Sequence, residues 1–371
     1  MTAPALIRVA SGPLTEMLTS IFAAAGGAAD EAEAIAWNLI EASLMGHDSH
    51  GVVRTERYVE WAEQGQVHFG RRARSVIDAE AFALLDGQNG FGQSVGREAV
   101  DAGIAKARAA GAAVVGLRRA GHLGRIGAWA ERACAADLVS IHFVNVQNSL
   151  LVAPFGAAER AMSTAPVCIG VPEPGGVFLL DFATSAIAEG KALVAVKGGK
   201  AAPEGALIGA DGRPTADPRV LYGASAGTPV PNPRGGPGAL APMGGHKGSG
   251  LAIACELLAG ALTGSGAGGQ DQAVHNGMLS IYLDPARLDD GHGWSRAVRD
   301  YIAFVRGRAA AADVAGVQIP GDPERATMAE RLRHGLPLPT AVWESLLNAA
   351  RRVGLDPAGI AAPILDQGDP P

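Results

Sequence analysis

The alternation of short apolar runs with amphipathic stretches between residues 75 and 194 restricts the fold more than any other feature. Runs typical of strands lie at 82–86, 113–117, 138–146, 168–171 and 177–181. Stretches with helical spacing lie between them at 94–110 and 126–136, and another runs from Ser185 to about residue 194. Strands and helices that alternate in this way form a sheet with helices packed on it. The sequence therefore predicts an α/β core.

Both ends of the chain are predicted to be helical. Helices are expected at 13–25, from Asp30 to residue 46 with Asp30 and Glu33 as a capping box, from Asp48 or Ser49 to about 64, and at 295–312, 323–334 and 340–353. The Gly/Pro-rich stretch 198–245 is expected to be a long ordered loop, followed by a helix at 250–262 and a strand at 278–283. We therefore expect a helical segment 1–75, an α/β core 76–319, and a helical segment 320–371 that packs back on the core or on the first segment.

Composition and charge exclude several classes of protein. The net charge is -6 and no block of lysine and arginine occurs, so a nucleic-acid partner is not expected. The longest uncharged stretch, 138–158, contains a histidine and a proline, so it suits a buried strand better than a membrane helix. The N-terminus lacks the pattern of a secretory signal. Three cysteines in apolar runs (Cys134, Cys168 and Cys255) indicate buried thiols in a reducing cytoplasm.

The segment DSHGVVRTERY (48–58) carries the first candidate site. If it is helical, His50 and Arg54 lie one above the other, Tyr58 continues the stripe, and Ser49 orients the imidazole or caps the helix. The positive end of the helix would attract an anion. An arginine fork binds a carboxylate while a neighbouring imidazole exchanges a proton. The alternative is an ordinary N-cap followed by solvated side chains.

Four more segments lie where a predicted strand or loop leads into a helix, namely 90–96, 121–127, 181–185 and 244–250. Glycines and free amides at such places let a ligand approach the backbone, and Lys247 adds a charge that reaches a phosphate. The segment 90–96 has the spacing G-x-G-x-x-x-G, one residue off the dinucleotide fingerprint, and is interpreted as a turn and helix start. For the other three a structural cap is the alternative.

Histidines also allow a metal site to be considered. A catalytic zinc needs three protein ligands, and His47, His50 and His122 are the candidates for a metal-dependent hydrolase. His47-x-x-His50 straddles a helix start, and no third ligand is signalled near it in the sequence. We therefore expect no metal and keep the hydrolase as an alternative.

Taken in order, these segments resemble the type-2 malate/L-lactate dehydrogenase family, which includes ureidoglycolate, sulfolactate, diketogulonate and piperideine-2-carboxylate enzymes. The resemblance rests on DSHGVVRTERY (48–58), GHLGRIG (121–127), APFG (153–156), T-x-P (164–166), LDFATS (180–185) with GK (190–191), DGRPTADP (211–218), GGHKGSGLA (244–252), ELLAGALTG (256–264) and IPGDPE (319–324). It covers nearly the whole chain.

The resemblance implies a homodimeric oxidoreductase that uses NAD or NADP, with a central mixed sheet and a cofactor fold that is not the Rossmann arrangement. It implies that His50 is the proton donor and acceptor with Ser49 beside it, that Arg54 binds the substrate carboxylate, and that Thr164 and Tyr58 also contact substrate. His122 is the acid/base in some members. The implied cofactor contacts are His122, Leu123, Gly124, Arg125, Ile126, Asn148, Asp181, Phe182, Ala183, Thr184, Lys247, Pro320 and Gly321.

Two departures from the family pattern concern the substrate. Ala165 stands where the family commonly has the asparagine of T-N-P, and Ala157 stands where a second glycine usually follows APFG. We expect hydride transfer between the nicotinamide and C2 of a small 2-hydroxy or 2-oxo acid, or of a cyclic imino acid. Arg118, Arg119 and Arg125 are candidates for a 2′-phosphate contact. The non-catalytic alternative is a silent binding protein of the same fold.

Overall fold

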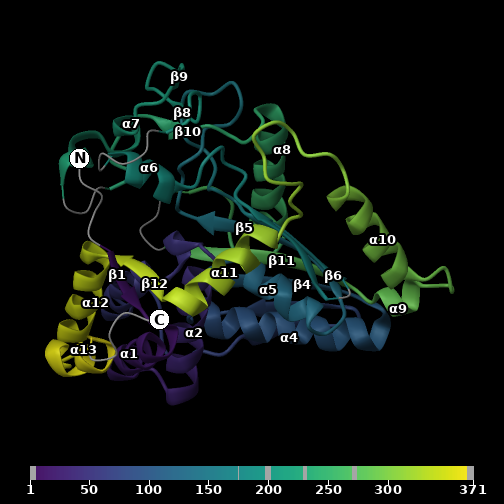
Figure 1. Cartoon of the computed structure of the whole chain (residues 1–371), viewed down its shortest axis with the longest axis horizontal. Coiled ribbons are helices and arrows are strands. Elements are labelled where there is room, and N and C mark those ends of the chain that lie inside the picture. Colours follow the sequence, from purple (N-terminus) through teal and green to yellow (C-terminus); the bar gives the residue numbers. More distant parts are fainter. Residues whose placement is uncertain (1–5, 174, 197–201, 229–231, 270–273, 366–371) are drawn as a thin grey trace.

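A seven-stranded sheet forms the centre of the molecule. The computed structural model describes the chain except for residues 1–5, 174, 197–201, 229–231, 270–273 and 366–371 (Figure 1). The strands are β2 (Arg74–Asp78), β3 (Phe82–Asp86), β4 (Ala112–Ala120), β5 (Val139–Gln147), β6 (Val167–Glu173), β7 (Gly176–Phe182) and β11 (His275–Leu283). Their order is β2-β3-β4-β11-β5-β6-β7, in which β3 and β4 pair parallel and the other neighbours pair antiparallel. The prediction of a central mixed sheet is confirmed.

Helices α4 (Gly92–Ala110) and α5 (Gly127–Cys134) cover one face of this sheet. Their apolar sides pack against alternate strand residues, because successive strand side chains point to opposite faces. The other face receives the π-helical turn η4 (Glu256–Ala261), which continues α8 (His246–Cys255) and lies over β5 and β11. The segment 90–96 is a turn and helix start, as predicted, because α4 begins at Gly92.

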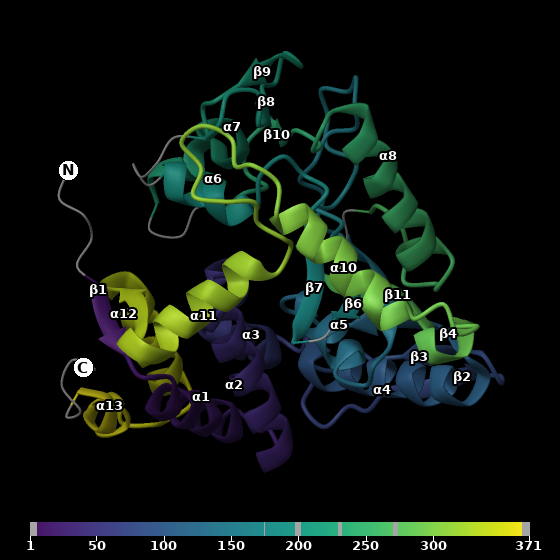
Figure 2. The ribbon, with the colours of Figure 1, turned by 45° about the vertical axis from the view of Figure 1, so that its right-hand side comes forward.

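The two ends of the chain build a second hydrophobic core together. Its elements are β1 (Leu6–Val9), α1 (Ser11–Ala24), α2 (Ala29–Leu44), α3 (Thr55–Glu63), β12 (Leu336–Pro339), α12 (Thr340–Arg352) and α13 (Pro357–Leu365). Strand β1 pairs antiparallel with β12, and α1 lies beside α12 and α13 in both views (Figures 1 and 2). Strand β1 is thus held by β12 from the other end of the sequence.

A third apolar cluster lies under the Gly/Pro-rich stretch. The stretch was predicted as a loop, but it contains β8 (Leu207–Ile208), β9 (Pro214–Thr215), α7 (Arg219–Tyr222), the 3-10 turn η3 (Gly223–Gly227) and β10 (Ala239–Leu240). Residues 198–201 and 229–231 of it lie outside the described residues. Helix α6 (Glu189–Val196) starts four residues later than predicted, because Ser185 forms a bridge with Pro242 instead.

The remaining helices are α9 (Pro285–Leu288), α10 (Trp294–Arg306) and α11 (Asp322–His334). No helix in the described part of the chain is both long and apolar enough to cross a bilayer. The capping box predicted at Asp30 is wrong, because α2 begins at Ala29 and its N-cap, Ala28, has no side-chain hydrogen bond. Asp30 lies in the first turn of α2, where its negative charge interacts favourably with the helix dipole.

Candidate active site

The segment around His50 is not the continuous helix that the sequence predicted. It forms two 3-10 turns, η1 (Asp48–His50) and η2 (Val52–Arg54), separated by Gly51 in an extended conformation. A side chain at Gly51 would overlap Ser43 of α2, whose hydroxyl accepts a hydrogen bond from the Val52 amide at 3.1 Å. Close packing on α2 therefore breaks the helix, and the predicted helical stacking of His50 on Arg54 is wrong.

Tertiary contacts nevertheless bring the predicted residues together. The rings of His50 and His122 stack in parallel, with centroids 5.3 Å apart and planes 4° from parallel. The Tyr58 hydroxyl lies 2.6 Å from His122 Nδ1. The Tyr58 side chain is 1% exposed, so its polar atom faces His122 and not an open surface. His50 Nδ1 is buried and has no hydrogen-bond partner in the described part of the chain.

Both imidazoles are uncharged near neutral pH. Burial first, and then the charge of Arg54, lowers the pKa of His50 to about 3. The same causes, with His50 added, hold the pKa of His122 well below its usual value. Burial also raises the pKa of the Tyr58 hydroxyl to about 12. An uncharged imidazole has one ring nitrogen that donates a hydrogen bond and one that accepts.

Arg54 is anchored at one atom and open at the others. Its Nε donates to the Ser49 carbonyl at 2.6 Å. Within the described residues its two terminal nitrogens make no hydrogen bond or ion pair. The charge of Arg54 acts on both His50 and His122, so the guanidinium lies near the two imidazoles. Ser49 also borders α6, because a side chain at Gly190 would lie 3.0 Å from Ser49 Cβ.

The segment 121–127 is held by residues that the sequence did not single out. Asn276 of β11 accepts from the Leu123 amide at 2.9 Å, and Gln93 of α4 donates to the His122 carbonyl at 3.3 Å. Gln93 also donates to the Tyr58 hydroxyl at 3.1 Å. Gln93 lies in the segment 90–96, which the sequence predicts to be a turn and helix start. Its position at the start of a helix is the sequence feature that could have indicated its contact with the site.

Arg125 is buried and makes its ion pairs through one terminal nitrogen, while its Nε and Nη1 have no hydrogen-bond partner among the described residues. Its side chain is 1% exposed and forms ion pairs with Glu131 of α5 and, at 3.4 Å, with Glu41 of α2. Burial opposes the charge of Arg125, but these two carboxylates outweigh it and raise the arginine's pKa. Arg118 and Arg119 pair with the buried Asp86. All three arginines thus pair with carboxylates in this structure, and a contact of any of them with a 2′-phosphate stays a prediction.

Asp181 and Thr184 connect the end of β7 with its surroundings. Asp181 accepts from the Gly127 amide at 2.7 Å, and burial raises its pKa. The Thr184 amide and hydroxyl both donate to the Thr164 carbonyl, at 3.0 and 3.1 Å. Pro320 lies beside the same strand, where its carbonyl accepts from the Leu179 amide at 3.1 Å. Gly321 follows at a φ of +96° as the N-cap of α11.

The remaining predicted cofactor residues lie on the α8 side of the molecule. The Met243 amide donates to the Thr184 carbonyl at 2.8 Å, and the glycine turn that follows leads to Lys247 in the first turn of α8. Asn148 lies just after β5 at a φ of +64°. Within the described residues, Lys247 makes no hydrogen bond or ion pair with His50 or His122. The predicted site residues therefore form two groups: one contains His50, Arg54 and His122, and the other is the glycine turn that leads to Lys247.

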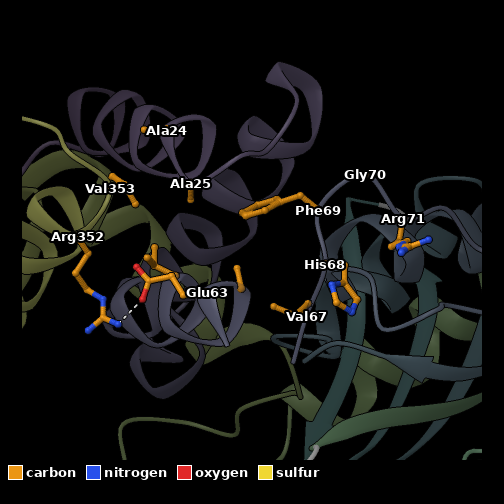
Figure 3. Close-up of a pocket in the computed structure, with 12 residues that line it drawn as sticks. Ala24, Ala25, Glu63, Val67, His68, Phe69, Gly70, Arg71, Arg352 and Val353 are labelled. Carbon is orange, nitrogen blue, oxygen red and sulfur yellow. Dashed lines mark hydrogen bonds and ion pairs between the residues drawn. The ribbon is translucent and has the colours of Figure 1, made fainter. Parts of the chain in front are cut away.

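A cavity of about 660 Å³ lies elsewhere, between α1, α3, α12 and the segment 67–71 (Figure 3). Its lining includes Phe69, Arg71 and the ion pair of Arg352 with Glu63, and contains none of the predicted site residues. The metal-dependent hydrolase is not favoured either. Within the described residues, ligand atoms gather closely enough for an ion at Asp289, Asp290 and His292, and not at His47, His50 and His122.

Comparison with known proteins identifies the class. A model of the malate/L-lactate dehydrogenase family matches residues 9–347. L-lactate dehydrogenase of Cupriavidus necator is 37% identical over 92% of this chain and 96% of its own length. Hydroxycarboxylate dehydrogenase B of Escherichia coli is 36% identical over 92% of this chain and 93% of its own. The structure of delta1-piperideine-2-carboxylate reductase from Pseudomonas syringae pvar. tomato aligns with a TM-score of 0.78 at 30% identity, covering 93% and 100% of the two chains.

The fold and these relatives define an oxidoreductase that acts on the CH–OH group of hydroxy acids. The chain belongs to the malate/L-lactate dehydrogenase family, as its motifs predicted.

Proposed function

We propose that the chain catalyses reversible hydride transfer between a nicotinamide cofactor and C2 of a small 2-hydroxy or 2-oxo acid. The observation that carries this proposal is the open fork of Arg54, anchored on the Ser49 carbonyl beside two stacked, uncharged imidazoles. Arg54 holds the substrate carboxylate, because a planar fork binds both of its oxygens in a fixed orientation. The C2 oxygen then lies toward the histidines.

His50 moves the proton. Since its Nδ1 is buried and has no partner among the residues described, Nε2 is the ring atom that exchanges a proton with the C2 oxygen. The uncharged form, favoured by the low pKa of His50, is the base needed when the hydroxyl loses its proton. A bound carboxylate offsets the charge of Arg54, which is one cause of that low pKa, so substrate eases protonation of His50 in the reverse direction.

The residues present fit a nicotinamide cofactor. The turn before α8 has glycines at φ of +59° and +65°, and Lys247 follows with no hydrogen bond or ion pair to the described residues. Free amides and a cation at a helix start suit a phosphate. We propose that Lys247, Asn148, residues 122–126, residues 181–184 and the turn Pro320–Gly321 hold NAD or NADP, which accepts or supplies the hydride when bound.

A cyclic imino acid is the second candidate substrate. It is favoured by the likeness to the reductase from Pseudomonas syringae. Ala165 bears on the choice, because it lacks the side-chain amide that is common at this position of the family. A methyl group neither donates to nor accepts from a substrate polar atom.

We also propose that the chain acts as a homodimer in the cytoplasm. Phe82 and Val114 are register partners on neighbouring strands, 50% and 39% exposed, and form an apolar area that a second copy would cover. The three cysteines are unpaired and buried, which suits a reducing compartment. Light scattering of the purified protein, with a mass of one chain as the contrary result, tests the dimer.

A substrate screen tests the proposed reaction. Oxidation of NADH and NADPH is followed with 2-oxo acids and cyclic imino acids, and reduction of NAD and NADP with 2-hydroxy acids. We expect turnover with one class of carboxylate and a KM raised roughly tenfold or more by Arg54→Lys, because lysine loses the second parallel hydrogen bond. Arg57→Lys, on the exposed side of α3, is the matched control. Cofactor binding without turnover on the whole panel would support the silent binding protein instead.

A further inference from the structure

We propose that Gln93 and Tyr58 are positioning residues that hold His122 in one tautomer, with its proton on Nε2. In that form His122 offers a hydrogen-bond donor to the substrate and cannot take up the proton that His50 removes. The role toward substrate rests on the proposed function, whereas the tautomer itself does not.

The three side chains form a buried chain of hydrogen bonds. Gln93 Nε2 lies 3.1 Å from the Tyr58 hydroxyl oxygen, which lies 2.6 Å from His122 Nδ1. Gln93 is 2% exposed and Tyr58 is 1% exposed. Solvent therefore supplies neither a donor nor an acceptor to the middle of the chain.

The backbone of His122 fixes the direction of the first bond. Its carbonyl oxygen is only an acceptor and lies 3.3 Å from Gln93 Nε2, so the amide group of Gln93 must turn its NH₂ and not its oxygen toward this side. The same NH₂ faces Asn38 Oδ1 at 3.5 Å. An NH₂ group can only donate, so the Tyr58 oxygen accepts from Gln93.

The direction of the second bond follows from the first. The Tyr58 hydroxyl has one hydrogen, and in the described part of the chain His122 Nδ1 is the acceptor within reach of it. If Nδ1 carried a proton instead, the Tyr58 oxygen would accept twice and its own buried hydrogen would have no partner, which costs the full desolvation of a polar group. Nδ1 is therefore the acceptor, and the proton of the uncharged ring is on Nε2.

This assignment gives the two histidines different roles. His122 Nε2 makes no hydrogen bond to the described residues and is not among the sealed atoms without a partner, so it is open to substrate. An N–H held in place near a developing negative charge stabilises that charge without moving. His122 therefore polarises the C2 oxygen, while His50 carries the proton. Because the rings of His50 and His122 are stacked, proton transfer by only one of them avoids placing two positive charges side by side.

The tautomer is read directly by NMR of protein labelled with ¹⁵N-histidine, with the His122 signals assigned by their loss in His122→Gln. We expect a protonated Nε2 and an unprotonated Nδ1 in the unmodified protein. In Gln93→Glu a carboxylate accepts the Tyr58 hydrogen, so the tyrosine oxygen becomes an acceptor and the His122 proton moves to Nδ1. Tyr58→Phe removes the donor and gives a mixture of tautomers.

Gln64→Glu is the control, because it places the same charge on an exposed position at the end of α3. It should leave the His122 signals unchanged. A proton on Nδ1 in the unmodified protein, or an unchanged tautomer in both Gln93→Glu and Tyr58→Phe, would overturn the inference. These outcomes are readable even if no hydroxy acid is turned over. With an active substrate, Gln93→Glu should lower kcat roughly 10²-fold with little change in KM.

Discussion

At the scale of single residues, the chemistry of the site depends on burial more than on local spacing. His50 and Arg54 were predicted to meet through one helix, but Gly51 interrupts it. Instead, Val52 is held on α2, His50 stacks on His122 of the segment 121–127, and the charge of Arg54 acts on both rings. The same enclosure lowers the pKa of His50, since a charged imidazole loses its water there. The low pKa follows from the fold, whereas the identity of the residue was visible in the sequence.

Loss of the His50 imidazole should therefore remove proton transfer and leave binding intact. We predict that His50→Ala lowers kcat by about 10²–10⁴-fold while the affinity for the cofactor is unchanged. Steady-state turnover and fluorescence titration with the reduced cofactor measure the two quantities. Near-normal turnover would assign the proton to another group, and His122→Ala would then be the next variant to measure.

Ala165 is a second residue whose backbone is informative. Its φ is +34° and its side chain is fully buried, although alanine disfavours this left-handed region by about 1–2 kcal/mol. Asparagine, common at this position in the family, tolerates it better.

We predict that Ala165→Gly raises the free energy of unfolding by about 1 kcal/mol, because glycine adopts this conformation without a clash. Urea unfolding measures the change. Ala99→Gly in the middle of α4 is the matched control and should lower stability by a similar amount, since its backbone is helical and its side chain is also buried. A loss of stability in Ala165→Gly equal to that in the control would mean that φ at residue 165 is unstrained.

At the scale of helices and strands, the elements with a long apolar repeat were predictable and the short edge elements were not. Strand β3 lies where it was predicted, and α12 ends within one residue of its predicted end. Strand β2 was missed because all five of its residues are exposed, so no apolar alternation marks it. Strands β1 and β12 were missed because each is four residues long and is stabilised by pairing with the other end of the chain.

The contact between α4 and the segment 121–127 shows why the site was only partly predictable. Gly92, at the start of α4, packs directly on backbone atoms of Gly121 and His122, and a side chain there would lie 2.6 Å from the Gly121 carbonyl oxygen. Gly92 could be recognised in the sequence as a turn residue. Its contact with Gly121 and His122 could not be predicted, because these residues lie in a different segment of the sequence.

We predict that Gly92→Ala displaces His122 and lowers kcat roughly 10- to 100-fold, because small misplacements of a catalytic group are costly. It should also cost about 1–3 kcal/mol of stability, since backbone atoms cannot move aside. Turnover is compared with that of Gly12→Ala in α1, where the added carbon meets nothing within 4 Å. Equal turnover of the two variants would show that the segment adjusts without disturbing His122.

At the scale of the whole molecule, a buried charge cluster joins the helical ends to the sheet. Arg125 pairs with Glu131 of α5 and with Glu41 of α2, and Asp181 of β7 faces the same charge. Glu324 of α11 reaches the cluster through His47, at 3.5 Å. Elements from both ends of the chain therefore meet around one cation, which belongs to the same segment, 121–127, as His122.

Removal of that cation should destabilise the protein in a way that depends on pH. Burial, the largest cause, already raises the pKa of Glu131, and Arg125 acts against it. In Arg125→Met the pKa of folded Glu131 rises further above its value in the unfolded chain. The folded state then binds more protons than the unfolded state, so stability falls as pH rises above the unfolded pKa. The loss should be about 3 kcal/mol near neutral pH.

Urea unfolding at about pH 5 and about pH 8 checks this prediction, and the deficit of Arg125→Met relative to the unmodified protein should be smaller at the lower pH. The double variant Arg125→Met/Glu131→Gln should recover much of the loss at the higher pH, because no unpaired carboxylate is then buried beside α5. An equal deficit at both pH values, with no recovery in the double variant, would mean that the guanidinium stabilises the junction through its packing and not through its charge.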